Sequence, residues 1–375
     1  MIQSSQVVAH PAPRGRVAVA MSGGVDSSVA AALLLEQGWD VVGVHMKLHT
    51  PPEAQRRDKS CCSLDDSLDA RQVCARLGIP FYVLDFQEVF KREVIDYFVE
   101  SYRQGQTPNP CVMCNRTVKN RLLFERVREF GCTHLATGHY ARVRPNPDSG
   151  APELVRALDL RKDQTYFLFG TRPEELPWLV FPLGDYEKPH ARKIAARHGL
   201  VTWDKPDSQE VCFVPSDYRE FLADHLTGPP PAPGPLLDTA GRTLGEHRGL
   251  PYYTVGQRRG LGVSAPHPLY VVALHPERNE VVLGAEEELY GRTLQVSQVN
   301  WVSIPPPSQP RPALVKVRYS HAGTPALLTP GMQDTVSVQF SEPVKAITPG
   351  QAAVFYDGDV LLGGGWIRSG GMERA

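Results

Sequence analysis

Three cysteines stand where they could do chemistry together. Cys111 and Cys114 have Cys-x-x-Cys spacing directly after the segment 107–110, and Cys212 follows much later in the chain. Cys-x-x-Cys spacing lets both sulfurs face one reaction centre or one metal ion. A structural zinc site would need a second such pair, and the sequence has none. A zinc half-site or a chance pair are the plainer interpretations, and Cys212 alone would be interpreted as buried and inert.

The second chemical feature is the stretch Ser22-Gly-Gly-Val-Asp-Ser27. The apolar run 16–21 predicts a buried strand before it, and a helix is expected from about residue 27 to residue 37. Two adjacent glycines let backbone N–H groups approach an anion, and the helix start adds its positive end. No Gly-Lys-Ser/Thr follows, which excludes the kinase-type P-loop. We predict a phosphate cradle here, with a plain strand-to-helix turn as the alternative.

The elements that must position these residues predict an α/β domain. Strands and helices alternate with short connections, which is typical of a doubly wound parallel sheet. Ligands bind such sheets at the carboxyl ends of the strands, where Met46, Gly138 and His139 lie. Met46 could pack on an adenine or fill the core. The further strands are expected at 41–47, 80–85 and 134–140, and the further helices at 68–77, 90–103 and 116–128.

Two expectations concern the surroundings of the cysteines. Residues 105–115 should form an extended, non-helical loop, because prolines flank Asn109. Cys212 is expected in a short apolar strand. The basic stretches 116–128 and 188–198 are candidates for RNA phosphate contacts, and solvated charged faces are the alternative.

Composition gives broad limits. The 375 residues suffice for two or three domains, and 42% hydrophobic with 22% charged residues is ordinary for a globular protein. The formal net charge of -1 gives no bulk sign of nucleic-acid binding, so local patches would have to meet a polyanion. Seven cysteines, without a secretory signal or long apolar span, favour a reducing cytoplasm and no membrane.

The composition shifts at a Pro-rich run, 229–235, after which strand patterns dominate. Arg258 and Arg259 in this part are further candidates for phosphate contact. We expect an ATP-binding catalytic domain at 1–205, a small central β-rich domain at 206–292 and a C-terminal β-barrel domain at 293–375.

Four stretches together resemble the MnmA family of tRNA-specific 2-thiouridylases, in the ATP-pyrophosphatase (PP-loop) superfamily. The resemblance implies an adenine nucleotide alpha hydrolase-like α/β domain followed by two small β domains. It also implies ATP-dependent adenylation of the C2 oxygen of the wobble uridine, then sulfur transfer to give 2-thiouridine, AMP and pyrophosphate. The stretches are 22–27, 107–115, 136–140 and 205–213, and 253–262 with 318–319 extend the match over nearly the whole chain.

The resemblance implies a role for each matching residue. ATP, with Mg²⁺ near Asp26, would be held by Ala20, Met21, Ser22, Gly23, Gly24, Val25, Asp26, Ser27, Met46 and Gly138. Cys212 would carry the sulfur as a persulfide, and Cys114 would be the nucleophile that resolves it, leaving a disulfide between them.

The implied partners are a tRNA and a sulfur source. The target base would meet Asn109, Pro110 and Cys111, and the C-terminal barrel would contact the tRNA. Substrates would be tRNAs of the Lys, Glu and Gln types, and a sulfur-delivering protein or persulfide donor would supply the sulfur. The implied tRNA contacts are His139, Lys162, Asp163, Gln164, Arg318, Tyr319 and Gln351.

One position departs from the family pattern. Many members have Asp where this chain has Cys111, and there the Asp is the proposed acid/base. Cys111, Cys114 and Cys212 could instead ligate a 4Fe–4S cluster with one open iron, as related tRNA thiolases are thought to do. Persulfide and cluster chemistry both remain open, as does any part for Cys61 and Cys62.

Two rivals share some of these features. Another PP-loop adenylating synthetase, of the amidotransferase or argininosuccinate type, would have the glycine-rich loop but no need for the cysteines. A non-catalytic tRNA- or nucleotide-binding protein would not be expected to keep reactive thiols. A test for turnover of ATP to AMP in the presence of tRNA would distinguish this non-catalytic protein from the enzymes.

Overall fold

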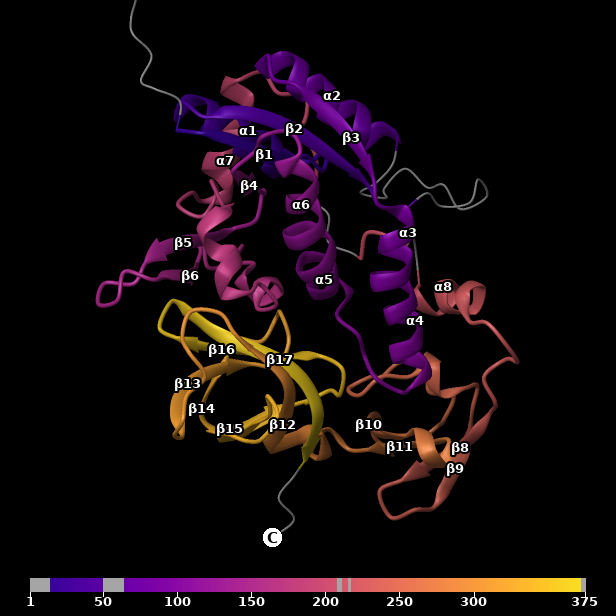
Figure 1. Cartoon of the computed structure of the whole chain (residues 1–375). Coiled ribbons are helices and arrows are strands. Elements are labelled where there is room, and N and C mark those ends of the chain that lie inside the picture. The colour runs from indigo at the N-terminus through magenta and orange to yellow at the C-terminus, as the bar shows by residue number, and fades with distance from the viewer. Residues whose placement is uncertain (1–13, 50–63, 208–210, 215–216, 372–375) are drawn as a thin grey trace, which may run out of the picture.

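The computed structural model describes residues 14–49, 64–207, 211–214 and 217–371, so Cys61 and Cys62 lie outside the described residues. It contains an α/β layer, a small β unit and a β-barrel (Figure 1). The helices are α1 (Val25–Glu36), α2 (Leu64–Leu77), α3 (Gln87–Phe90), η2 (Lys91–Ile95), α4 (Asp96–Arg103), α5 (Pro110–Met113), η3 (Cys114–Leu122), α6 (Leu123–Arg128), η4 (Thr165–Leu168), η5 (Pro173–Trp178), α7 (Lys188–Arg197), α8 (Tyr218–His225), η6 (Leu250–Tyr252), η7 (Pro276–Arg278) and η8 (Glu286–Leu289).

Strands make up three sheets. The first half of the chain contributes β1 (Arg16–Ala20), β2 (Asp40–Lys47), β3 (Phe81–Asp85), β4 (His134–Ala136), β5 (Ala141–Pro145), β6 (Pro152–Arg156) and β7 (Leu179–Val180). The second half contributes β8 (Gly234–Asp238), β9 (Thr243–His247), β10 (Tyr270–His275), β11 (Glu280–Gly284), β12 (Tyr290–Trp301), β13 (Arg311–Lys316), β14 (Thr324–Pro330), β15 (Val336–Lys345), β16 (Ala352–Asp357) and β17 (Val360–Gly371).

The N-terminal sheet is parallel, in the order β3-β2-β1-β4-β7, with β1 at its centre. Alternate residues of β1 enter different cores, because successive side chains of a strand point to opposite faces. Val17 and Val19 pack with α1, α2 and α7, whereas Ala18 packs with the helices η3 and α6 on the other face. The doubly wound α/β prediction is therefore confirmed.

The helical layer formed by α5, η3 and α6 lies between this sheet and the barrel (Figure 1). Its core, which includes Val118 and Leu123, is continuous with Val354 and Leu361 of the barrel. The prediction of an extended loop through residue 115 was wrong in its second half. The helix begins at Pro110, because proline at the first helical position has a suitable φ and lacks only an N–H that would have no helical partner. Asn109 caps it by accepting a hydrogen bond from the Val112 N–H at 3.4 Å.

The barrel closes through six strands. They follow the order β12-β15-β14-β13-β16-β17, and a direct β12–β17 pairing completes the ring. The β5–β6 hairpin, although it comes from the first half of the chain, joins this sheet where Val155 pairs with Val360. The small central sheet has the order β10-β11-β8-β9. Two small β units, the last a barrel, were predicted, and both are present.

No helix in the described ranges is long and apolar enough to cross a membrane.

Candidate functional site

The glycine-rich turn joins β1 to the start of α1. Gly23 has φ +74°, and a Cβ there would lie 2.7 Å from the Asp66 Cα, so only glycine fits. Gly24 is the N-cap of α1 and has ordinary extended dihedrals, and a Cβ there would meet only Ser22 Oγ, at 3.4 Å. The first glycine is therefore required by packing, whereas the second leaves open space beside the N-terminus of a 12-residue helix. Such a terminus is suited to binding an anion.

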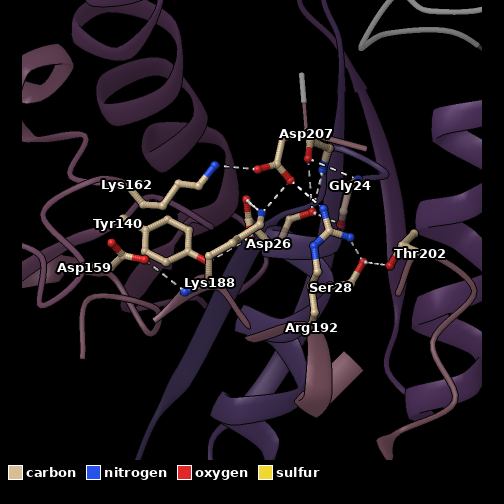
Figure 2. Close-up of polar contacts among 12 residues, drawn as sticks. Gly24, Asp26, Ser28, Tyr140, Asp159, Lys162, Lys188, Arg192, Thr202 and Asp207 are labelled. Carbon is tan, nitrogen blue, oxygen red and sulfur yellow. Dashed lines mark hydrogen bonds and ion pairs between the residues drawn. The ribbon is translucent and has the colours of Figure 1, made fainter. Parts of the chain in front are cut away.

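Hydroxyl groups stabilise this turn. The Ser22 N–H donates to Ser27 Oγ at 3.1 Å, and Ser28 Oγ donates to the Gly24 carbonyl at 2.8 Å. Thr202 Oγ1 then donates to Ser28 Oγ at 3.0 Å (Figure 2). Ser27 and Ser28 are buried, so part of their hydroxyl capacity is used to hold the loop.

Lys205 connects the glycine-rich loop to α2 by hydrogen bonds and ion pairs. Its Nζ donates to the Gly23 carbonyl at 3.0 Å, and it forms ion pairs with Asp66 at 2.7 Å and Asp69 at 2.6 Å. Gly138 approaches from β4, and a Cβ there would lie 2.7 Å from the Ser27 nitrogen. Met46, at the end of β2, is 9% exposed and belongs to the core. The predicted ATP-binding residues thus gather at the carboxyl ends of β1, β2 and β4.

An ion-pair network surrounds Asp26 (Figure 2). Lys188 Nζ lies 2.7 and 2.8 Å from the two Asp26 carboxylate oxygens, and the Tyr140 hydroxyl donates to Asp26 at 3.2 Å. The same Lys188 Nζ lies 2.8 Å from Asp207. Lys162, at 2.8 Å, and Arg192, at 2.9 Å, complete the contacts to Asp207.

Charge controls the protonation of Asp207. Burial acts to raise its pKa, but hydrogen bonds from Lys162 and Lys188 act in the opposite direction and the net result is a pKa of about 2. Asp207 is therefore a carboxylate at neutral pH. Neither it nor Lys188 was singled out from the sequence as a site residue. The stretch 188–198 was noted only as a basic patch, and Asp207 only as part of the segment that contains Cys212.

The basic patch at 188–198 divides into two parts. Lys188 and Arg192 turn toward the glycine-rich loop, whereas Arg197 and His198 pair with Glu36 of α1 at 2.7 and 2.9 Å. Lys188 and Arg192 are four residues apart and share one face of α7. Arg197 and His198 are at the C-terminal end of α7, which lies beside Glu36 at the end of α1.

The cysteines differ in exposure. Cys114 is buried, Cys212 is half-buried and Cys111 is exposed. Cys212 packs against the same core cluster that contains Cys114, next to Phe213, whose ring contacts Phe90 and Phe98. Cys212 lies in a turn, so the predicted strand is wrong, and this short segment is fixed by side-chain packing instead of a sheet. Cys114 therefore belongs to this core, and Cys212 packs against it.

Burial raises the pKa of the Cys114 thiol, and the positive charge of Lys119 acts against this rise. Both residues lie in η3, a π-helix, in which one turn closes between residues five apart. Lys119 is consequently about one turn beyond Cys114. The same lysine contributes, after burial, to lowering the pKa of His139 to about 3, so His139 is neutral at physiological pH.

A 4Fe–4S cluster at the cysteines stays a prediction. In the parts of the chain that the structure describes, which include Cys111, Cys114 and Cys212, no group of three or more His, Cys, Asp or Glu residues is arranged to hold a metal ion.

The residues with implied tRNA contacts have varied surroundings. Asp163 is buried and accepts hydrogen bonds from Thr165, and Gln164 accepts one from the Tyr140 N–H at 2.9 Å. Gln351, from the barrel, donates to the carbonyls of Thr107 and Pro108, both at 3.1 Å, and so supports the segment that leads to Cys111.

Tyr319 presents an aromatic face to solvent. It is 40% exposed and packs on Phe167 with ring centroids 4.6 Å apart. Its neighbour Arg318 donates to the Lys345 carbonyl at 2.8 Å. The cation over the Tyr319 ring is Lys316, whose Nζ lies 5.7 Å from the ring centroid. An exposed aromatic ring suits stacking with an unpaired base.

Comparison with known proteins gives consistent matches along the chain. Residues 15–216 match the family model described as tRNA methyl transferase HUP domain. Residues 219–285 match a tRNA methyl transferase PRC-barrel domain, and 291–367 an aminomethyltransferase beta-barrel domain.

Curated relatives cover nearly the whole chain. A protein of Symbiobacterium thermophilum is 49% identical, over 94% of this chain and 92% of its own length. One from Carboxydothermus hydrogenoformans is 49% identical, over 94% and 98%, and one from Geobacter metallireducens is 50% identical, over 94% and 97%. Each of the three is named tRNA-specific 2-thiouridylase MnmA.

Proposed function

Because this chain belongs to the MnmA family of tRNA-specific 2-thiouridylases, we propose that it replaces the C2 oxygen of the wobble uridine of tRNA with sulfur at the expense of ATP. The observation that carries this proposal is a phosphate cradle at β1–α1 in the same chain as two cysteines of one hydrophobic core, with Cys114 inside the core and Cys212 packed against it. An adenylating synthetase of another type would need the cradle but not the thiols.

ATP binds at the cradle, with its phosphates at Gly24 and the start of α1. The backbone N–H groups and the helix end stabilise the negative charge that develops as pyrophosphate leaves. Asp26 would hold Mg²⁺, since carboxylate oxygens are ligands that this ion prefers, and the ion would neutralise phosphate charge. The uridine O2 attacks the α-phosphorus, the bond to pyrophosphate breaks, and O2 becomes part of an AMP leaving group.

Sulfur then arrives on Cys212 as a persulfide. The Cys114 thiolate attacks Sγ of Cys212, a Cys114–Cys212 disulfide forms, and the outer sulfur leaves as hydrosulfide. Hydrosulfide attacks C2 of the activated uridine and expels AMP, which gives 2-thiouridine. An external thiol reductant must reduce the disulfide before the next cycle. We derive no step through an iron–sulfur cluster, which stays a prediction.

The tRNA is proposed to lie against the helical layer and the barrel. Asn109, Pro110 and Cys111 meet the target base, and Arg318 and Tyr319 contact neighbouring nucleotides. Gln351 contributes by supporting the Thr107–Pro108 backbone. Substrates of the Lys, Glu and Gln types, a protein or persulfide sulfur donor, and a cytoplasmic location are proposed on the family resemblance.

The test is thiolation by cysteine variants. Cys114→Ser and Cys212→Ser should each abolish 2-thiouridine formation and leave ATP binding unchanged, while Cys74→Ser, at a buried thiol in α2, should retain thiolation. Retained thiolation in either active-site variant would refute the assignment. Mass spectrometry of the nucleoside also separates exchange of oxygen for sulfur from the methyl transfer that the family-model descriptions name.

A further inference from the structure

A cationic cavity lies beside the glycine-rich loop, at the N-terminal end of α7. Its volume is about 390 Å³, and its lining includes Arg161, Lys162, Lys188 and Arg192, with Asp159 as an acidic member. Arg161 pairs with Asp159 at 3.2 Å, so the other three cations dominate its charge. None of these three was predicted to bind ATP.

The three cations converge on one carboxylate (Figure 2). Lys162, Lys188 and Arg192 all lie within 2.9 Å of Asp207, and Lys188 also contacts Asp26. Three positive charges thus face two carboxylates, which leaves an excess of positive charge. The Lys188 side chain is only 9% exposed, and a lysine buried this deeply must have an anionic partner.

The position of the cluster indicates which anion it serves. Lys188 contacts Asp26, which is in the first turn of α1, two residues after Gly24. Lys162 and Arg192 are held next to Lys188 because all three contact Asp207. An anion that is held at Gly24 and extends toward Lys188 would therefore meet these two donors as well. A single carboxylate offers two oxygens to these donors, whereas linked phosphates offer more oxygens and more charge.

We propose that Lys162, Lys188 and Arg192 bind the terminal phosphates of ATP, and the pyrophosphate product, and that Asp207 is the internal counter-ion which these phosphates displace. This inference rests on the proposed function and names residues for its nucleotide site. It places Lys162 on the nucleotide and not on tRNA.

The test is the binding of inorganic pyrophosphate with Mg²⁺, and separately of AMP, measured by calorimetry on the full chain. Lys188→Gln and Arg192→Gln should each weaken pyrophosphate binding by about tenfold or more, because each removes a charged hydrogen bond. AMP affinity should change little, since AMP lacks the terminal phosphates. Arg197→Gln is the matched control, because Arg197 is on the same helix but pairs with Glu36.

Asp207→Asn gives the opposite expectation. Removing the competing carboxylate should tighten pyrophosphate binding several-fold, whereas a residue that merely holds the fold together would weaken it. Weaker binding by Asp207→Asn, unchanged binding by Lys188→Gln, or equal loss of AMP and pyrophosphate affinity would each overturn the inference. Wild-type protein that binds pyrophosphate but forms no 2-thiouridine would instead refute the proposed function alone.

Discussion

Replacing Gly24 with alanine should weaken ATP binding without unfolding the protein. Its dihedrals, φ −99° and ψ 169°, are open to any residue. Apart from its chain neighbours, the atom nearest to the new methyl carbon would be Ser22 Oγ, at 3.4 Å. Alanine is a poorer N-cap residue than glycine, so the free energy of unfolding should fall, but only by about 1 kcal/mol.

The same methyl group would occupy the space beside the loop N–H groups. A phosphate oxygen accepting from such a group lies about 2.9 Å away, which leaves no room for an added carbon. Loss of one charged hydrogen bond corresponds to about 1.5–3 kcal/mol, so ATP affinity should fall by about tenfold or more.

Gly23→Ala is the informative comparison. Here φ is +74° and the new carbon would lie 2.7 Å from the Asp66 Cα. Left-handed strain of about 1–2 kcal/mol and overpacking of about 1–3 kcal/mol should add, so this variant should lose stability as well as binding. Calorimetry with ATP and thermal unfolding distinguish the two cases. A Gly24→Ala protein that binds ATP like the wild type would refute the placement of phosphate at this backbone.

Three further perturbations test other contacts. Lys119→Gln should raise the pH at which Cys114 reacts with iodoacetamide, because burial raises the pKa of the Cys114 thiol and the charge of Lys119 opposes that rise. An unchanged midpoint of this reaction would contradict the role of Lys119, and the surface variant Lys91→Gln is the control. Lys205→Gln should lower the free energy of unfolding by about 1–2 kcal/mol, since it removes charged contacts to Gly23 and two carboxylates. In the same denaturation assay the control Lys47→Gln, at the exposed pair with Asp85, should lower it by less than about 0.5 kcal/mol. Gln351→Ala should slow single-turnover thiolation and leave ATP affinity unchanged, because it frees the Thr107–Pro108 backbone; unaltered thiolation would exclude that support role.

Local patterns in the sequence predicted the α/β domain and its loop well. Apolar runs and glycine turns placed β1 and β2 within a residue of their observed bounds, because burial on both faces leaves a plain apolar signature. The start of the helix at Pro110 was missed, because prolines were interpreted as helix breakers although one can occupy the first helical position.

Contacts between distant segments could not be predicted in this way. Lys188 meets Asp26 across 162 positions, and Gln351 meets Thr107 across 244. Nothing in the composition of either segment indicates its partner, since only the folded sheet and barrel bring them together. The β5–β6 hairpin joined the barrel for the same reason, through a single pairing of Val155 with Val360.

The most direct test is thiolation by oxygen-free protein with ATP, a persulfide donor, a thiol reductant and unmodified tRNA. Iron-free and iron–sulfur-reconstituted samples are run side by side, and 2-thiouridine is measured by mass spectrometry. We expect 2-thiouridine from the iron-free sample, together with AMP, and none without ATP. Product only after reconstitution would contradict the persulfide route through Cys114 and Cys212, and product in neither sample would contradict the proposed function itself.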